Sequence, residues 1–179
     1  IKDETIKKEP YLLIISSLIK RKNLILIKKI AKLYGNKIKF VCPTPTSKNN
    51  MRKINYLKKN DVKIYHRVDD LKLKSLYLNS SFILVPSSYE GLSLIPLESI
   101  MFSKPVIMSN INPHLFWKLP DKFYFDLNDF NKLLEKINFY LNQDKIFIDY
   151  SLFKSFNNVL SFVQRERKQS LYSLFDENF

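Results

Sequence analysis

The sequence has only one cysteine, two histidines and two glycines among its 179 residues. A single cysteine excludes an internal disulfide, and one cysteine with two histidines argues against a Cys/His metal site. Cys42 ends an apolar run, so we expect a buried structural thiol rather than a reactive one. Such sparing use of cysteine fits a reducing, cytoplasmic setting.

Long apolar runs are missing as well. The run at 11–19 is already interrupted by two serines, and no stretch approaches the roughly 20 residues that a membrane-spanning helix needs. No signal-peptide pattern is present. The hydrophobic content of 45% nevertheless predicts a globular fold, with one domain over residues 11–179. We interpret the polar residues 1–10 as a linker or a start added for expression, and since the first residue is not Met, we expect that the start of the protein is missing.

Acidic residues are scarce relative to basic ones. The chain has 30 Lys and Arg against 17 Asp and Glu, a net charge of +13 and a pI of about 9.7. Such a charge suits nucleic acid or an anionic membrane. The alternative is a composition bias that favours Lys, Ile and Asn. We favour the bias and do not expect nucleic acid as a partner.

The most informative stretch runs from residue 81 to 110. Residues 82–85 are apolar and end at Pro86, which predicts a buried strand of a parallel sheet. After Gly91 the pattern predicts a helix at 94–102, where Pro96 is tolerated in the first turn. A further strand is predicted at 106–108. This strand–helix–strand order favours a right-handed crossover in an open α/β sheet.

Two glutamates lie in this unit, Glu90 in the loop and Glu98 on the helix. Glu98 falls in the middle of the apolar arc of its helix, between Leu94 and Phe102. A carboxylate there is either buried at a cost or points into a crevice with hydrogen-bond donors, such as the hydroxyls of a ligand. A buried pair with a nearby Lys or Arg is the structural alternative.

The residues of this unit resemble a known family. Glu90 and Glu98 enclose seven residues in the string EGLSLIPLE, which PSSY precedes and SKPVI follows. This string resembles the C-terminal, donor-binding domain of the retaining, nucleotide-sugar-dependent glycosyltransferases of the GT-B fold. The resemblance covers about residues 11–143.

The remaining pattern agrees with an α/β fold. Further strands are predicted at 11–15, 37–42, 62–65 and 123–125, and further helices at 24–34, 51–59, about 70–79 and 128–143, with C-terminal helices from about 145. Asn23 and Asp69 or Asp70 are predicted helix caps, and Gly35 is predicted to end its helix. We therefore expect a Rossmann-like open parallel sheet of about six strands with helices on both faces, one half of a GT-B fold.

Three loops then lie at carboxyl ends of strands and could surround one site. They contain Arg21 and Lys22, His66 and Arg67, and Glu90 and Gly91. The segment 111–120 is predicted to be irregular, and its His114 to be a surface residue.

The resemblance implies a role for each matching residue. Glu90 would be the catalytic residue at the donor sugar, and Glu98 would accept hydrogen bonds from the ribose hydroxyls. The donor-binding set that the resemblance implies is Arg21, Lys22, Arg67, Val68, Gly91, Leu92, Ser93, Leu94 and Glu98. Within it, Arg21, Lys22 and the amides of residues 92–94 would hold the diphosphate, and Arg67 and Val68 would line the base pocket.

The resemblance also implies a reaction. A nucleotide-diphosphate sugar, such as a UDP- or GDP-sugar, would be the donor, without cofactor or metal. A sugar or lipid-linked acceptor would be held by an N-terminal domain that this chain lacks. We expect a cytoplasmic location. Peripheral association with the inner face of the membrane is compatible with it. The alternatives are a non-catalytic nucleotide- or partner-binding module, a basic nucleic-acid-binding α/β protein, and a nucleotide-sugar epimerase of the same fold.

Overall fold

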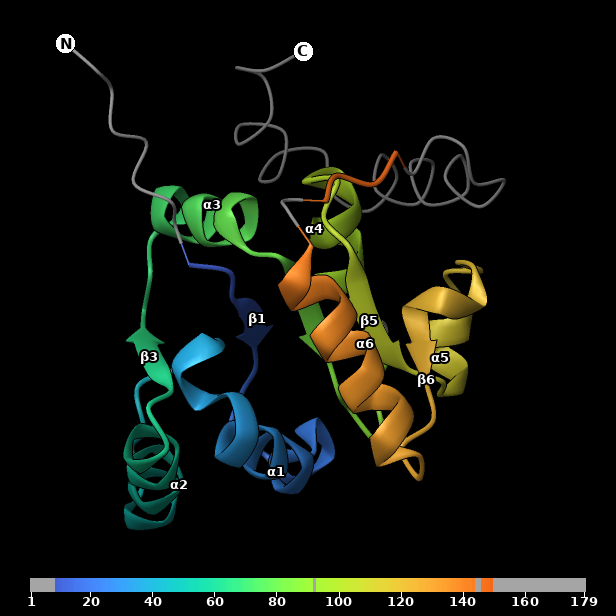
Figure 1. Ribbon diagram of the computed structural model, residues 1–179. Helices are drawn as coiled ribbons and strands as arrows, with labels where there is room; N and C mark the ends of the chain where they lie inside the picture. The colour runs from blue at the N-terminus through green and yellow to red at the C-terminus, as the bar shows by residue number, and fades with distance from the viewer. Residues whose placement is uncertain (1–8, 92, 144–145, 150–179) are drawn as a thin grey trace, which may run out of the picture.

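The computed structural model describes residues 9–91, 93–143 and 146–149. Within them, six parallel strands form one open sheet in the order β3-β2-β1-β4-β5-β6 (Figure 1). The strands are β1 (Leu12–Ile15), β2 (Ile38–Cys42), β3 (Lys63–His66), β4 (Phe82–Val85), β5 (Val106–Ser109) and β6 (Tyr124–Phe125). The predicted Rossmann-like sheet is confirmed. Strand order reverses between β1 and β4, the switch point at which open α/β sheets bind ligands.

The central strands are buried on both faces, which explains their continuous apolar sequences. Every residue of β4 and β5 is buried. Leu12 of β1 pairs with Ile38 on one side and with Phe82 on the other. These pairings place the carboxyl ends of β1, β2 and β4 at one edge of the sheet.

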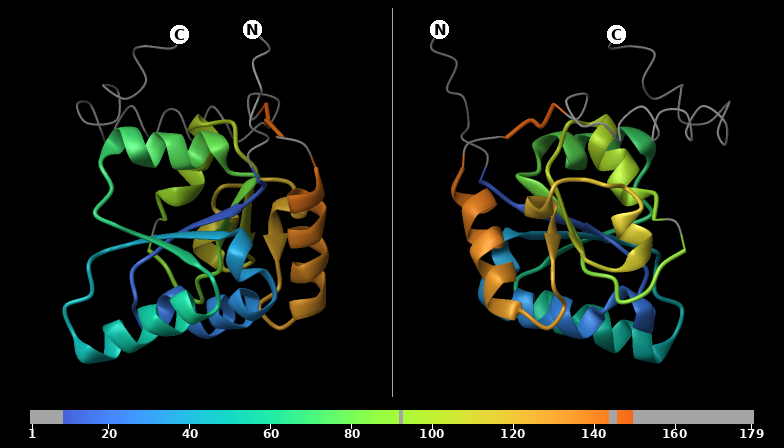
Figure 2. Two further views of the ribbon diagram at one scale, coloured as in Figure 1. Left: turned by 60° about the vertical axis from the view of Figure 1, so that its left-hand side comes forward. Right: turned by 90° about the vertical axis from the view of Figure 1, so that its right-hand side faces the viewer.

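Helices cover both faces of the sheet, as predicted. They are α1 (Leu24–Tyr34), α2 (Lys48–Lys59), α3 (Asp70–Asn79), α4 (Ile95–Met101), α5 (Asn112–Leu115) and α6 (Phe130–Asn142), with 3₁₀ turns η1 (Lys20–Lys22), η2 (Gly35–Lys37) and η3 (Asp121–Phe123). Figures 1 and 2 show α1 and α2 on one face and α3 and α4 on the other. Helix α6 lies beside α1, where the Tyr34 hydroxyl donates to Asn138 Oδ1 at 2.8 Å.

Polar side chains cap the helices at their amino ends. Asn23, with φ of 53°, accepts a hydrogen bond from the Leu26 amide at 3.3 Å, and Asp69 accepts one from the Lys72 amide at 2.7 Å. Asn23 was predicted as a cap, and Asp69 was one of the two predicted candidates at its helix. Ser47 caps α2 and makes this helix begin at Lys48, three residues before its predicted start at Met51.

Two local predictions differ from the structure. Gly35 follows the last residue of α1, but it keeps a right-handed helical conformation (φ −53°, ψ −45°) and leads into η2. The segment 111–120, predicted to be irregular, contains α5. Pro113 stands in the first turn of α5, where its missing N–H forfeits no hydrogen bond, so it does not break this helix.

The predicted leading segment falls mostly in residues 1–8, and the predicted C-terminal helices fall mostly in 144–145 and 150–179. All of these lie outside the described residues. No helix among the described residues is both long enough and apolar enough to cross a bilayer.

Candidate functional site

The loops after β1 and β4 meet at a buried carboxylate. Arg21 Nη1 lies 2.5 Å from Glu90 Oε2, and Lys22 Nζ forms an ion pair with Oε1. The Ser87 hydroxyl donates to the same Oε1 at 2.7 Å. Only 5% of Glu90 is exposed. The structure therefore joins three residues that were predicted to share a site, although sequence reasoning did not foresee that Glu90 would bind the two cations directly.

The two cations determine the charge of Glu90. Burial alone would raise the pKa of this carboxyl group, but hydrogen bonds from Lys22 and Ser87, the charge of Lys22 and the hydrogen bond from Arg21 together hold it below its usual value. Glu90 is thus a carboxylate at neutral pH. Because it balances only one of two positive charges, the cluster keeps a net positive charge that favours an anion.

A cavity of about 520 Å³ opens beside this cluster, at the carboxyl ends of β1, β2 and β3. Its walls are formed by Ile15, Ser16, Ser17, Lys22, Val41, Cys42, Pro43, Arg67, Val68, Leu73 and Ile95. Lys22, Arg67 and Val68 were predicted site residues. Sequence reasoning missed Cys42 and Pro43, although their place directly at the end of a predicted strand could have identified them.

Arg67 has an unusual backbone at this cavity. Its φ of 47° lies in the left-handed region, which a non-glycine residue adopts at some cost. Its neighbour Val68 also lines the cavity, together with the apolar Val41 and Leu73. The cavity lining thus combines apolar side chains, which suit a flat ring, with the cations of Lys22 and Arg67.

Glu98 lies on α4, one helical turn after Ile95 of the cavity wall. It is half-buried, and its Oε2 accepts a hydrogen bond from the Tyr77 hydroxyl at 2.5 Å. The Tyr77 ring is fully buried and stacks on Phe102 with centroids 4.9 Å apart. Burial, followed by the negative charge of Glu98, raises the pKa of Tyr77 well above its usual value, so that its hydroxyl remains a donor. Tyr77 therefore fixes the position of the Glu98 carboxylate, although Glu98 itself is not among the residues that line the cavity.

The loop before α4 contributes a buried hydroxyl group. Ser93 is 5% exposed, and its hydroxyl has no hydrogen-bond partner among the described residues. Gly91 is exposed, and Leu94 is the residue preceding α4. Leu92 lies outside the described residues. A buried hydroxyl without a partner is costly, and a bound ligand could satisfy it.

His114 is buried, so its prediction as a surface residue was wrong. None of its surface is exposed, and Nδ1 lies 2.8 Å from the carbonyl oxygen of Ser109. The Ser109 hydroxyl in turn donates to the Ser87 carbonyl at 2.5 Å. His114 thus lies behind the loop that carries Glu90. The neighbouring Asn112 and Pro113 suggested a surface loop, whereas the burial depends on contacts with β5.

Burial makes His114 a neutral residue. It lowers the pKa of His114 below the usual 6.5, although the Ser109 carbonyl and the charge of Glu90 partly oppose it. Nδ1–H donates to Ser109 in this form, and Nε2 has no hydrogen-bond partner among the described residues. A second proton would have to be buried on Nε2.

We expect stability to fall on mild acidification. Below pH 6.5 the unfolded chain takes up a proton at His114 that the folded chain resists, so the stabilisation is complete above pH 6.5 and is lost as pH falls toward the lowered folded-state pKa. The slope for one proton is at most about 1.4 kcal/mol per pH unit. His114→Asn keeps a donor for Ser109 but cannot titrate. Urea unfolding between pH 5 and 7 should therefore show a shallower slope for this variant, and an equal slope would contradict the assignment.

Cys42 is buried, as predicted, with its sulfur 3.5 Å from His66 Nδ1. Burial raises the pKa of the thiol to about 11. The residue therefore contributes an uncharged thiol to the cavity wall at neutral pH. In the described part of the chain, His, Cys, Asp and Glu do not gather in groups of three or more that could hold a metal ion.

Comparison with known proteins adds a family to this geometry. The sequence matches the glycosyl transferases group 1 family over residues 1–149. No curated protein matches it significantly. Among solved structures, the catalytic domain of cholesterol-alpha-glucosyltransferase from Helicobacter pylori has 16% identity and a TM-score of 0.60. A TarM mutant from S. aureus, in complex with fondaparinux, alpha-GlcNAc-glycerol and UDP, has 18% identity and a TM-score of 0.59. Starch synthase IV from Arabidopsis thaliana, bound to ADP and acarbose, has 19% identity and a TM-score of 0.57.

These structures differ in how much of their length is matched. The match to the glucosyltransferase covers 88% of this chain and 99% of that one. The match to TarM covers 94% of this chain and 34% of TarM, and the match to starch synthase IV covers 88% of this chain and 36% of the synthase. At such identities they establish the fold alone. The family match covers most of the sequence and includes the switch point, the cation cluster and the cavity. This chain therefore belongs to the glycosyl transferases group 1 family and is a glycosyltransferase domain.

Proposed function

We propose that this domain binds a nucleoside-diphosphate sugar in the cavity at the switch point and presents the sugar for retaining transfer. The observation that supports this most directly is the convergence of Arg21 and Lys22 on one buried carboxylate beside the cavity. The diphosphate is an anion, and the cluster has a net positive charge. Binding of the diphosphate there leaves the apolar wall for the base and Glu98 for the ribose.

The same cluster supports transfer without a metal ion. As the bond to the sugar breaks, negative charge develops on the leaving diphosphate, and fixed cations stabilise it. Arg21 and Lys22 supply two such charges. Glu90, held as a carboxylate between them, would lie where the diphosphate joins the sugar, and its role is to stabilise positive charge at the anomeric carbon. The acceptor would be a sugar or a lipid-linked sugar, held by an N-terminal domain.

The site constrains the identity of the base less than it constrains the diphosphate. Val68, Val41 and Leu73 offer apolar contacts that any base could make. UDP in the TarM structure and ADP in the starch synthase structure show that similar folds accommodate different bases. We therefore propose a nucleoside diphosphate of unspecified base as the common ligand.

Calorimetric titration with UDP, GDP and ADP at physiological salt tests this proposal. We expect one of the three to bind, and Lys22→Ala to weaken it by roughly ten- to a hundredfold, since a hydrogen bond to a charged group contributes about 1.5–3 kcal/mol. The corresponding nucleoside should bind the variant as well as it binds the wild type.

Lys20→Ala is the matched control. Lys20 lies in the same 3₁₀ turn, is exposed and forms no ion pair with Glu90, so its removal should leave affinity nearly unchanged. Binding of none of the three diphosphates would contradict the proposal. An equal loss of nucleoside and diphosphate affinity in Lys22→Ala would show that Lys22 does not contact the phosphates.

A further inference from the structure

The positive charge of the chain is concentrated in one segment. Residues 10–60 contain 13 of the 30 Lys and Arg and none of the 17 Asp and Glu. This segment therefore accounts for the whole net charge of +13, and the rest of the chain is neutral overall. A composition bias would spread lysine over every solvated surface, so it does not explain this distribution.

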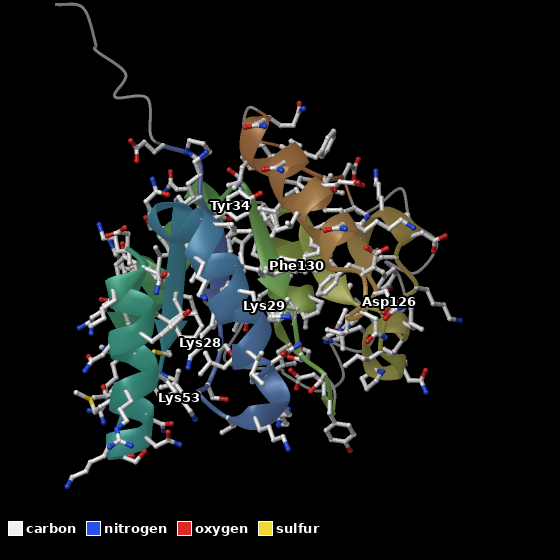
Figure 3. All side chains as sticks on the ribbon, turned by 60° about the horizontal axis from the view of Figure 1, so that its bottom comes forward. Lys28, Lys29, Tyr34, Lys53, Asp126 and Phe130 are labelled. Atoms are coloured by element: carbon white, nitrogen blue, oxygen red, sulfur yellow. The ribbon has the colours of Figure 1, made fainter. Side chains whose placement is uncertain are left out.

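In the fold, this segment builds one side of the molecule. It contains β1, α1, β2 and α2, and both helices cover the same face of the sheet (Figures 1 and 3). Lys28 Nζ lies 4.7 Å from the centroid of the Tyr56 ring, and Lys53 Nζ donates to the Leu18 carbonyl at 2.8 Å. Figure 3 shows these two lysines between α1 and α2. The first contact joins α1 to α2, and the second joins α2 to the loop after β1. Lys29 Nζ lies 5.9 Å from the centroid of the Phe130 ring of α6, and like the remaining Lys and Arg of the two helices it is exposed.

Helical periodicity places the outward side chains in one stripe on each helix. We call these side chains the basic face. They are Ile25, Lys29, Lys32 and Leu33 of α1, and Lys48, Met51, Arg52, Lys58 and Lys59 of α2, and all are exposed. Acidic residues stand at its borders: Asp61 follows the end of α2, and Asp126 precedes α6, on the side of α1 away from α2 (Figure 3).

Apolar side chains are mixed with the cations of the basic face. Ile25 is 72% exposed, Leu33 58% and Met51 46%. Helices that lie on a membrane combine lysine with exposed apolar residues in this way, because the apolar groups enter the boundary of the acyl chains while the cations meet anionic headgroups. Water alone would favour polar residues at these positions.

Nucleic acid fits the basic face less well. Recognition of phosphates and bases relies on Arg forks and on exposed aromatic rings that stack. Arg52 is the one arginine of this set, and its members include no aromatic residue. Exposed Ile and Leu have no role against a phosphate backbone.

We propose that the basic face docks this domain on the surface of an anionic lipid bilayer. None of the residues that line the cavity belongs to α1 or α2, so docking leaves the cavity open. The inference does not depend on the proposed nucleotide site, because neither Arg21 nor Lys22 belongs to the basic face.

Sedimentation of the full 179-residue chain with lipid vesicles tests the proposal. We expect it to bind vesicles of equal parts phosphatidylglycerol and phosphatidylcholine, not vesicles of phosphatidylcholine alone, and to be released by salt. Replacing Lys32, Arg52, Lys58 and Lys59 together by Gln should reduce partitioning by at least about a hundredfold.

The matched control removes the same charge from exposed positions elsewhere and should have a much smaller effect. It replaces Lys72, Lys118, Lys122 and Lys132 by Gln. Equal losses in the two variants would overturn the assignment to this face, as would failure of the wild type to bind the anionic vesicles.

A second variant separates a bilayer from a soluble polyanion. Ile25→Ser with Leu33→Ser changes side chains that folding leaves mostly exposed, so its thermal unfolding should lie close to that of the wild type. We expect it to lose about tenfold in vesicle partitioning, since each side chain contributes its buried apolar area. Binding to a single-stranded oligonucleotide should be weak in all variants. Tight oligonucleotide binding, unaffected by Ile25→Ser and Leu33→Ser, would instead show that the basic face takes nucleic acid.

Discussion

Glu98→Gln should lower the affinity of this domain for its nucleoside diphosphate by roughly ten- to a hundredfold, because hydrogen bonds from the ribose hydroxyls to a charged acceptor contribute about 1.5–3 kcal/mol. Glutamine has the same shape and can still accept a hydrogen bond from Tyr77, so the fold should be retained. Isothermal calorimetry of wild type and variant gives the affinity ratio, and thermal unfolding confirms that both are folded.

Tyr77→Phe is the control for this experiment. Phenylalanine keeps the stack on Phe102 and removes only the hydroxyl that donates to Glu98 at 2.5 Å. If Glu98 binds the ribose and Tyr77 only positions it, this variant should lose several-fold in affinity and retain its preference for the diphosphate. A folded Glu98→Gln domain with unchanged affinity would remove Glu98 from the site.

The sequence predicted the sheet well because buried parallel strands carry a continuous apolar signal. Strands β1, β2 and β4 begin and end within one residue of their predicted limits. The placement of the three functional loops followed from this, since carboxyl ends of parallel strands share one edge. The small strand β6 was predicted one residue too long, at 123–125, because its first residue belongs to the turn η3.

Contacts between the loops could not be predicted in the same way. Glu90 and Lys22 are far apart in sequence, and the pattern assigned one to the sugar and the other to the phosphate. Their ion pair depends on side-chain directions that only the packed structure defines. His114 illustrates the same limit. Its neighbours Asn112 and Pro113 suggested a loop at the surface, whereas its side chain lies inside, against Ser109.

Gly35 was predicted at the end of its helix, but the structure requires a glycine there for a different reason. Glycine after a helix usually provides a left-handed backbone. Gly35 instead has φ of −53°, a conformation open to any residue. What it lacks is a side chain. A Cβ built on Gly35 would lie 1.4 Å from the carbonyl oxygen of Asn60 and 2.6 Å from its carbonyl carbon. The requirement for glycine comes from the close approach of the turn between α2 and β3, which the sequence around Gly35 does not reveal.

We therefore expect Gly35→Ala to destabilise the domain by about 3 kcal/mol or more, at or beyond the upper end of overpacking changes. The added Cβ is fixed to the backbone of residue 35 and would meet backbone atoms of Asn60, so neither can move away as the end of a flexible side chain would. The turn at Asn60 is also fixed from within, since the Val62 amide donates to the Leu57 carbonyl at 3.2 Å. A domain with a typical stability of about 5–15 kcal/mol would lose a large part of it.

Gly91→Ala is the matched comparison for this prediction. A Cβ on Gly91 would meet nothing within 4 Å, and its φ is not positive. The same added methyl group should then change stability by no more than about 0.5 kcal/mol. Urea unfolding of the two variants and the wild type measures both effects on one scale. Because the two substitutions are chemically identical, a large difference between their midpoints isolates the contact with Asn60. Equal midpoints would mean that the turn after α2 can yield to a methyl group, and that Gly35 is not required for packing.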